Sequence, residues 1–314
     1  MIPTNDIEND RLKLSVVMIT YKHEQFIKKS IEGVLMQKTD FDFELILADD
    51  CSPDNTSNIV NDLLAKNNNQ RCNVKYTRHE KNKGMMGNFI WALSQSKSKY
   101  IALCEGDDYW IDEYKLQKQI DFLESDFDFS LCFHQAKKIN IVDEKHTIYP
   151  EISGNVFKSN DFFDIVTIPM ASVVFRNNIK LPFLDNHSHP DFILLCSLLS
   201  NGYAYFLNEV MSIYTVHEGG TTFNHFNPTY LKNRINELKI ESNFKGYDKI
   251  VSKEIGNLYV KHVLLLVDNF EKNITKTELI QYLINCIKIP KRSTFYFNAY
   301  KKLIKSTIKK TTRN

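Results

Sequence analysis

The chain has 314 residues, of which 43% are hydrophobic and 25% charged, and its formal net charge is +2. This composition is typical of a soluble globular protein with one large α/β domain and an extension, or with two domains. The longest apolar run near the C-terminus, 263–267, is far shorter than the ~20 residues that cross a bilayer, so we do not expect an integral membrane protein.

Four stretches of strand length alternate with amphipathic stretches in the first part of the chain. Strands are expected at 14–20, 43–48, 74–77 and 100–104, and helices at 26–35, around 59–64 and at 87–96. Asp54, Asn55 or Thr56 can cap the second helix. The alternation predicts a mainly parallel sheet with helices on both faces.

Polar side chains follow each of these strands. They are Thr20 and Tyr21, Asp49 and Asp50, Arg78, and finally Glu105, Asp107 and Asp108. In parallel sheets ligands bind beyond the carboxyl ends of the strands, so these residues should converge on one crevice. The chain has neither GxGxxG after the first strand nor GxxxxGK[ST]. A nucleotide bound there would therefore have its phosphates held by a metal and by side chains.

The run Glu105-Gly106-Asp107-Asp108 directly follows the fourth strand. In an extended chain Glu105 and Asp107 point to one side and Asp108 to the other, so two carboxylates can share a cation. Gly106 removes side-chain bulk and lets an anionic ligand approach. A divalent ion with oxygen ligands would offset the repulsion among the three carboxylates. The alternative is an acidic surface turn.

Several motifs in order resemble the signatures of the family 2 glycosyltransferases. They are Ser-Val-Val-Met-Ile-Thr-Tyr from Ser15, Glu-Leu-Ile-Leu-Ala-Asp-Asp-Cys-Ser-Pro-Asp-Asn-Thr from Glu44, 84–88, Glu105-Gly-Asp-Asp-Tyr-Trp, Lys115-Leu-Gln-Lys-Gln, 171–176, Asp191 and 214–220. The resemblance covers roughly residues 14–222. It implies a GT-A fold, a nucleotide-diphosphate sugar as donor and, usually, inversion of the anomeric centre. On this basis we expect a GT-A domain at 1–225, with a nucleotide-binding half at about 14–110 and an acceptor half at about 111–225.

The resemblance also implies roles for single residues. The donor would be bound by Thr20, Tyr21, Glu24, Asp49, Asp50, Arg78, Asn88, Glu105, Gly106 and Asp107. A Mn²⁺ or Mg²⁺ ion would be held by Asp107, Glu105 and His217, where the longer arm of Glu105 reaches the ion directly or through water. Asp191 would be the catalytic base, accepting the proton of the acceptor hydroxyl. Its alternative role is a plain helix cap.

Other residues near these motifs have two interpretations each. Arg78, Lys83 and Arg176 are candidate phosphate or acceptor contacts, and solvated surface charges are the alternative. Tyr109 and Trp110 either stack on a sugar ring or fill the core beneath the acidic loop.

Beyond residue 225 the chain changes character. Stretches at 230–244, 249–270 and 277–287 predict helices, so residues 226–314 are expected to form a helical extension that shapes the acceptor side or a homodimer contact. Residues 288–314 hold nine Lys or Arg and no Asp or Glu. A basic amphipathic tail of this kind suits an anionic membrane surface, and a solvated helix end is the alternative. Nucleic acid is not expected as a partner, because no recognised binding module is present.

These features predict a metal-dependent, inverting hexosyltransferase that acts in surface-polysaccharide or glycan biosynthesis on a glycan or lipid-linked acceptor. Its expected location is the cytoplasm, either free or peripheral at the inner membrane face. The six cysteines lack CxxC spacing and no secretory signal is visible, which favours a reducing compartment. The competing class is a non-catalytic nucleotide- or glycan-binding module on the same fold. A nucleotidyltransferase is disfavoured because no glycine-rich, Arg-bearing loop follows the first strand.

Overall fold

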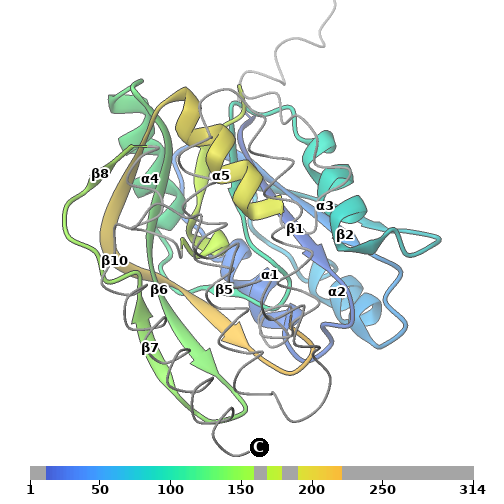
Figure 1. Cartoon of the computed structure of the whole chain (residues 1–314). Helices are drawn as coiled ribbons and strands as arrows, with labels where there is room; N and C mark the ends of the chain where they lie inside the picture. Colours follow the sequence, from blue (N-terminus) through green and yellow to red (C-terminus); the bar gives the residue numbers. More distant parts are fainter. Residues whose placement is uncertain (1–11, 159–167, 179–189, 221–314) are drawn as a thin grey trace, which may run out of the picture. The chain divides into compact units, whose positions relative to one another are not determined.

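The computed structural model describes residues 12–158, 168–178 and 190–220 (Figure 1). The chain divides into two units between His217 and Glu218. The predicted helices at 230–244, 249–270 and 277–287 and the basic tail lie outside the described residues. The helical extension at 226–314, and the boundary near residue 225, therefore remain predictions.

The first unit is built from alternating strands and helices, as the sequence predicted. In chain order they are β1 (Leu12–Thr20), α1 (Ile27–Leu35), β2 (Asp42–Asp49), α2 (Thr56–Leu64), β3 (Cys72–Arg78), α3 (Gly84–Gln95), β4 (Tyr100–Leu103), β5 (Tyr109–Trp110), α4 (Lys115–Ser125), β6 (Phe129–Asn140), β7 (His146–Tyr149), β8 (Val156–Phe157), the 3₁₀ turn η2 (Met170–Ser172), β9 (Val174–Arg176), α5 (Pro190–Asn201) and β10 (Tyr203–Val216). No helix among the described residues is long and apolar enough to cross a membrane.

The ten strands of the described residues belong to one sheet, in the order β3-β2-β1-β4-β9-β6-β10-β5, with β7 beside β6 and β8 beside β10. The four strands predicted from the sequence form its parallel half, since β1 pairs in parallel with both β2 and β4 and β2 pairs with β3. Strands β5, β7, β8 and β9 are antiparallel to their neighbours. The chain order reverses between β1 and β4, which is where ligands bind in open α/β sheets.

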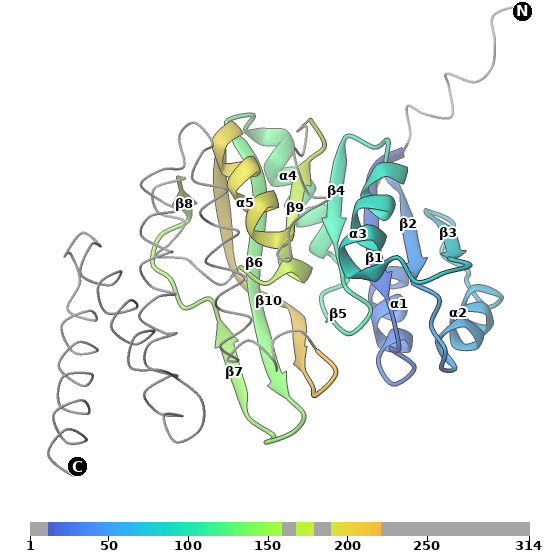
Figure 2. The same cartoon turned by 45° about the vertical axis from the view of Figure 1, so that its right-hand side comes forward.

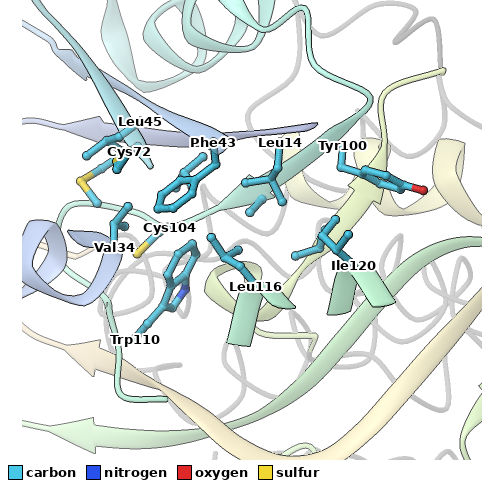
Figure 3. Close-up of a cluster of buried hydrophobic side chains, with 14 of the residues drawn as sticks. Leu14, Val34, Phe43, Leu45, Cys72, Tyr100, Cys104, Trp110, Leu116 and Ile120 are labelled. Carbon is cyan, nitrogen blue, oxygen red and sulfur yellow. The ribbon is translucent and has the colours of Figure 1, made fainter. Parts of the chain in front are cut away.

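Helices cover both faces of the sheet. On one face, apolar side chains of α1, α2 and α4 pack against alternate residues of the strands and form the main core, part of which is drawn in Figure 3. Helices α3 and α5 lie in front of the sheet in Figure 2, on the opposite face. Trp110 is buried in the main core among Val34, Cys104 and Leu116. Its indole N–H donates to Ala171 O at 2.7 Å, so Trp110 fills the core.

The register of the sheet aligns the carboxyl ends of three strands. Thr20 of β1 is the pairing partner of Asp49 in β2, and Asp49 is the partner of Arg78 in β3. The predicted convergence of these strand ends is therefore confirmed. The turn after β2 is tied to α2 by Asp54, whose Oδ1 accepts hydrogen bonds from the N–H (3.2 Å) and Oγ1 (2.7 Å) of Thr56.

Among the cysteines whose side chains the structure describes, four are free thiols. Cys72, Cys104 and Cys132 are buried, whereas Cys51 is partly exposed in the turn after β2.

Candidate active site

The loop that carries Glu105 to Asp108 continues along the edge of β1. The N–H of Cys104 donates to Val17 O at 3.1 Å, and the N–H of Gly106 donates to Ile19 O at 2.9 Å. These bonds bring the loop level with the end of β1. The acidic run therefore lies beside the end of the first strand.

Gly106 is required at this point because the β1 end lies against it. A Cβ at position 106 would lie 2.8 Å from Cβ and Oγ1 of Thr20 and 2.9 Å from Nδ1 of His23. Such distances are shorter than non-bonded contacts allow. The carbonyl of Gly106 also accepts a hydrogen bond from Ser30 Oγ at 2.9 Å, which anchors the loop to α1.

Asp107 lies between two histidines. Its Oδ2 is 3.2 Å from Nε2 of His217, which follows β10, and 3.8 Å from Nε2 of His23 in the loop after β1. One ligand atom from each of the three residues falls within 4.8 Å of the other two. The structure thus brings together the predicted ligands Asp107 and His217. Glu105 is not part of this cluster, and its contact with the ion remains a prediction.

His23 was not among the residues predicted from the sequence. The sequence signal was its position in the turn after β1, beyond the carboxyl end of a parallel strand, where ligand-binding side chains gather. A single histidine in a turn carries little information until a partner is known. The partners Asp107 and His217 are distant in sequence and become neighbours only in the fold.

Burial and mutual charge perturb the carboxyl groups of this loop. Burial, then the charges of Asp107 and Asp191, raise the pKa of Glu105 to about 7. Burial and the charges of Asp107 and Glu105 raise the pKa of Asp108 well above its ordinary value. For Asp107 burial acts to raise the pKa, but the hydrogen bond with His217 and the charges of His23 and His217 outweigh it and lower the pKa. The raised pKa values mean that the charged forms of Glu105 and Asp108 are disfavoured here, and a bound cation would stabilise them.

The histidine His23 is suited to be a ligand in its neutral form. Burial lowers the pKa of His23, and this outweighs the opposing effect of the Asp107 charge. A neutral imidazole keeps the lone pair that a metal ion requires. Within the part of the chain that the structure describes, three buried atoms around Gly106 have no hydrogen-bond partner, namely Oγ1 of Thr20, Nδ1 of His23 and Oε2 of Glu105. These residues fit a divalent cation, because the donor set is carboxylate and imidazole and several polar atoms lack a partner.

Asp108 turns away from the cluster, as the alternation of an extended chain predicted. Its Oδ1 accepts a hydrogen bond from the N–H of Thr215 in β10 at 2.8 Å. This bond, together with the antiparallel pairing of β10 with β5, fixes the end of β10 beside the acidic loop. The hydrogen bond between Thr215 and Asp108 therefore helps to place His217, two residues further on, beside Asp107.

The two aspartates after β2 have different surroundings. Both oxygens of Asp49 are engaged, because Oδ1 accepts from Ser52 N–H at 2.8 Å and Oδ2 accepts from Tyr76 O–H at 3.0 Å. Asp50 uses Oδ1 to accept from the N–H of Lys83 at 2.6 Å. Asp49 thus organises the turn, and Asp50 has more capacity to bind a ligand.

Three other predicted donor-binding residues lie around the same strand ends. Tyr21 is 39% exposed. Glu24 exchanges hydrogen bonds with the start of α2, since its Oε2 accepts from Asn55 N–H at 2.9 Å. Asn88 is buried, and its amide donates to Ala48 O at 2.9 Å. Their contacts with a nucleotide remain predictions.

Asp191 lies in the first turn of α5 and is exposed. Its charge contributes to raising the pKa of Glu105, which means that it lies near the acidic loop. This position is compatible both with a helix-stabilising charge and with a base at the site.

Arg176 does not contact the site, contrary to the prediction. It pairs with Tyr100 at the amino end of β4, whereas the cluster around Asp107 follows the carboxyl end of that strand. Its buried guanidinium donates to the carbonyls of Phe129, Leu123 and Asp126. Arg176 therefore holds the end of α4 against the sheet, and the expected phosphate or acceptor contact is wrong.

Residues 15–179 match the model of glycosyl transferase family 2. The match covers more than half of the chain, and the protein belongs to this family. WfaP of Escherichia coli, the UDP-Glc:alpha-D-GlcNAc-diphosphoundecaprenol beta-1,3-glucosyltransferase, is 30% identical over 217 residues, which are 68% of this chain and 81% of WfaP. An uncharacterized protein of Mycobacterium tuberculosis is 32% identical over 209 residues, 66% of this chain. The aligned region spans 60% of the length of that relative.

Solved structures share the fold. TarS 1–349 of S. aureus, in complex with UDP-GlcNAc, matches with a TM-score of 0.67 and 18% identity over 96% of this chain and 92% of that chain. The mannosyltransferase PcManGT of Pyrobaculum calidifontis, in complex with GDP-Man and Mn²⁺, matches with a TM-score of 0.56 and 12% identity over 95% and 87%. The described α/β unit has the GT-A fold, as the motifs implied.

Proposed function

We propose that this protein is an inverting, metal-dependent glycosyltransferase that moves a sugar from a nucleotide-diphosphate sugar to an acceptor hydroxyl. The observation that carries this proposal is the position of Asp107 between His217 and His23 at the strand ends, with the charge of Asp191 close enough to perturb Glu105. One site thus combines candidate ligands for a cation with a candidate base. Membership of glycosyl transferase family 2 supports the same reaction class.

The donor is proposed to lie in the crevice beyond β1, β2 and β3. Tyr21 offers an exposed ring, and Asp50 offers a buried carboxylate for the base or the ribose. Arg78 is half-exposed beside the turn, where its guanidinium donates to Ser52 O at 3.0 Å and can also meet a phosphate. Bound UDP-GlcNAc in TarS and bound GDP-Man in PcManGT support a nucleotide-diphosphate sugar as the donor class.

A divalent ion, Mn²⁺ or Mg²⁺, is proposed to be held by Asp107 and His217, with Glu105 as a direct or water-mediated ligand. Such an ion neutralises the negative charge that grows on the leaving nucleoside diphosphate. The fold positions Asp107 for this role. The backbone hydrogen bond of Gly106 holds the loop beside β1, and the hydrogen bond from the end of β10 to Asp108 fixes its other side. Mn²⁺ in the PcManGT complex supports a metal of this class.

Asp191 is proposed to be the catalytic base. Inversion requires the acceptor hydroxyl to attack from the face opposite the leaving group, and a carboxylate on that face accepts the proton of the hydroxyl. Asp191 is exposed in the first turn of α5, so an acceptor can reach it.

The acceptor is proposed to be a glycan or lipid-linked glycan in surface-polysaccharide biosynthesis. Support comes from WfaP, whose name specifies a diphosphoundecaprenol-linked acceptor and whose length is largely covered by the alignment. The excess of basic residues in 288–314 would favour contact with an anionic membrane from the cytoplasmic side. If deletion of 291–314 left liposome binding unchanged, the membrane contact would be refuted.

The test compares wild type with Asp191→Asn and Asp107→Asn. First, thermal stabilisation by UDP, GDP, CDP and dTDP sugars, with and without Mn²⁺, identifies the donor. With that donor, Asp191→Asn is expected to lose at least about 100-fold in kcat and to retain nucleotide binding, since general-base catalysis contributes 10²–10⁴-fold. Asp107→Asn should abolish the metal-dependent part of the stabilisation. Full turnover by Asp191→Asn would refute the assigned base, and absence of any nucleotide-dependent shift would favour the non-catalytic module.

A further inference from the structure

The loop after β1 holds His23 in a defined position. Lys22 adopts a left-handed conformation with φ of 59°, and its N–H donates to Ser52 Oγ at 3.1 Å. The N–H of His23 donates to Thr56 Oγ1 at 3.0 Å, and its carbonyl accepts from the N–H of Phe26 at 2.9 Å. The backbone of His23 is therefore tied both to the start of α2 and to the start of α1. These backbone hydrogen bonds limit where the imidazole of His23 can lie, which would not be the case in a loose surface loop.

Neither ring nitrogen of His23 has a hydrogen-bond partner among the described residues. Nδ1 is buried against Gly106 and lacks a hydrogen-bond partner. Nε2 faces Oδ2 of Asp107 at 3.8 Å, which is too long for a hydrogen bond. Buried histidines that serve packing alone usually have their nitrogens satisfied. The position of Nε2 therefore points to a missing partner between His23 and Asp107.

The second imidazole approaches the same carboxylate oxygen from β10. His217 Nε2 lies 3.2 Å from Asp107 Oδ2, and the ring of Phe26 packs on the His217 ring with centroids 4.5 Å apart. The three ligand atoms lie within 4.8 Å of one another. Two ligands that are each ~2.1 Å from one ion lie at most ~4.2 Å apart, so side-chain movements of well under 1 Å suffice. The side chains of His23 and Asp107 are 16% and 22% exposed, so an ion can enter from solvent.

We propose that His23 is a third side-chain ligand of the divalent ion, and that its imidazole makes the site select a transition-metal ion such as Mn²⁺ or Co²⁺ over Mg²⁺. This inference rests on the proposed function, which gives the ion its role. Mg²⁺ favours oxygen ligands in octahedral geometry and retains its waters, whereas imidazole nitrogen binds first-row transition metals better. A site with two imidazoles and one carboxylate should therefore discriminate more strongly than a site with one imidazole.

The test measures metal binding directly, without turnover. Mn²⁺ alone is titrated into the full chain while the electron paramagnetic resonance signal of free Mn²⁺ is recorded, and Mg²⁺ is then added as a competitor. The variants are His23→Gln, which removes the ligand, and His23→Glu, which places a carboxylate within similar reach. The control is His146→Gln, because His146 is exposed on β7 and lies outside the cluster. Thermal melting without metal establishes that each variant is folded.

His23→Gln is expected to weaken Mn²⁺ binding about tenfold or more, since even groups that only support a metal ligand are worth 10–100-fold in affinity. His23→Glu is expected to bind Mn²⁺ and to lose part of its preference over Mg²⁺. His146→Gln should match wild type. Equal Mn²⁺ affinity and equal preference in wild type and His23→Gln would overturn the assignment of His23, while the proposed function, tested through Asp191→Asn, would stand. Absence of Mn²⁺ binding by wild type would also overturn it.

Discussion

Lys115, at the start of α4, is a fully buried lysine whose replacement by methionine gives a quantitative test of the core. Its Nζ donates to Oε1 of Gln119 at 2.7 Å and lies 4.1 Å from the centroid of the Trp110 ring. Burial lowers the pKa of Lys115 to about 7, against the opposing effects of Cys104, Cys132 and Asp112. Methionine preserves an unbranched chain of similar length and removes the titrating amine.

The magnitude follows from the difference in proton binding between the folded and unfolded chain. An unfolded lysine binds its proton up to a pKa of about 10.4, whereas folded Lys115 releases it near pH 7. Between these values the unfolded state binds more protons, so the free energy of unfolding rises with pH by up to ~1.4 kcal/mol per unit. Because folded Lys115 is half protonated near pH 7, wild type should gain about 2 kcal/mol relative to Lys115→Met between pH 7 and pH 9.

The neighbouring groups do not interfere with this window. Burial raises the pKa of Cys104 well above its usual range and that of Cys132 to about 12, so both thiols remain protonated. Burial lowers the pKa of His134 well below its usual value, so this imidazole remains neutral. The loss of the Gln119 hydrogen bond in the variant costs ~1 kcal/mol at every pH and cancels from the comparison.

The assay is urea unfolding of the full chain at pH 7 and pH 9, followed by tryptophan fluorescence. Trp91 and Trp110 are the two tryptophans of the chain, and both lie in the first unit. Lys118→Met on the same helix is the control, because hydrogen bonds to Asp112 and Glu209 raise the pKa of Lys118 and it does not titrate in this window. If the stability difference between wild type and Lys115→Met stays constant from pH 7 to pH 9, the reasoning about a neutral buried lysine is refuted.

Two further substitutions test the packing of the site and of the sheet. Gly106→Ala should lower the free energy of unfolding by about 1–3 kcal/mol and weaken Mn²⁺ binding, because the new methyl group would displace Thr20 or His23. Denaturant unfolding and Mn²⁺ titration measure the two effects. If stability and Mn²⁺ affinity are both unchanged, the loop accommodates the methyl group without displacing either residue. Arg176→Met should lower stability by about 3 kcal/mol, since it leaves three carbonyls unpaired. The nucleotide affinity of Arg176→Met, measured by calorimetry, should equal that of wild type. A large loss of nucleotide affinity would mean that Arg176 does contribute to the binding site.

The sequence alone determined the parallel half of the sheet. Three of its strands, β1, β2 and β4, are largely continuous apolar runs, because helices cover both faces of the sheet there, and such runs can be recognised without a structure. Since parallel strands present their carboxyl ends at one edge, the convergence of Thr20, Asp49 and Arg78 followed from the pattern. The different directions of Asp107 and Asp108 likewise followed from local chain geometry.

Only the tertiary structure decided which side chains complete the cluster and which serve the core. His23 and His217 meet at Asp107 because β10 runs beside β5 and its end is fixed by the bond from Thr215 to Asp108, a contact between residues distant in sequence. Arg176 resembled a phosphate ligand by type and motif, but its antiparallel strand places it at the opposite end of β4. Residue type and spacing report local chain direction, whereas the partners of a polar group depend on long-range pairing that no local pattern encodes.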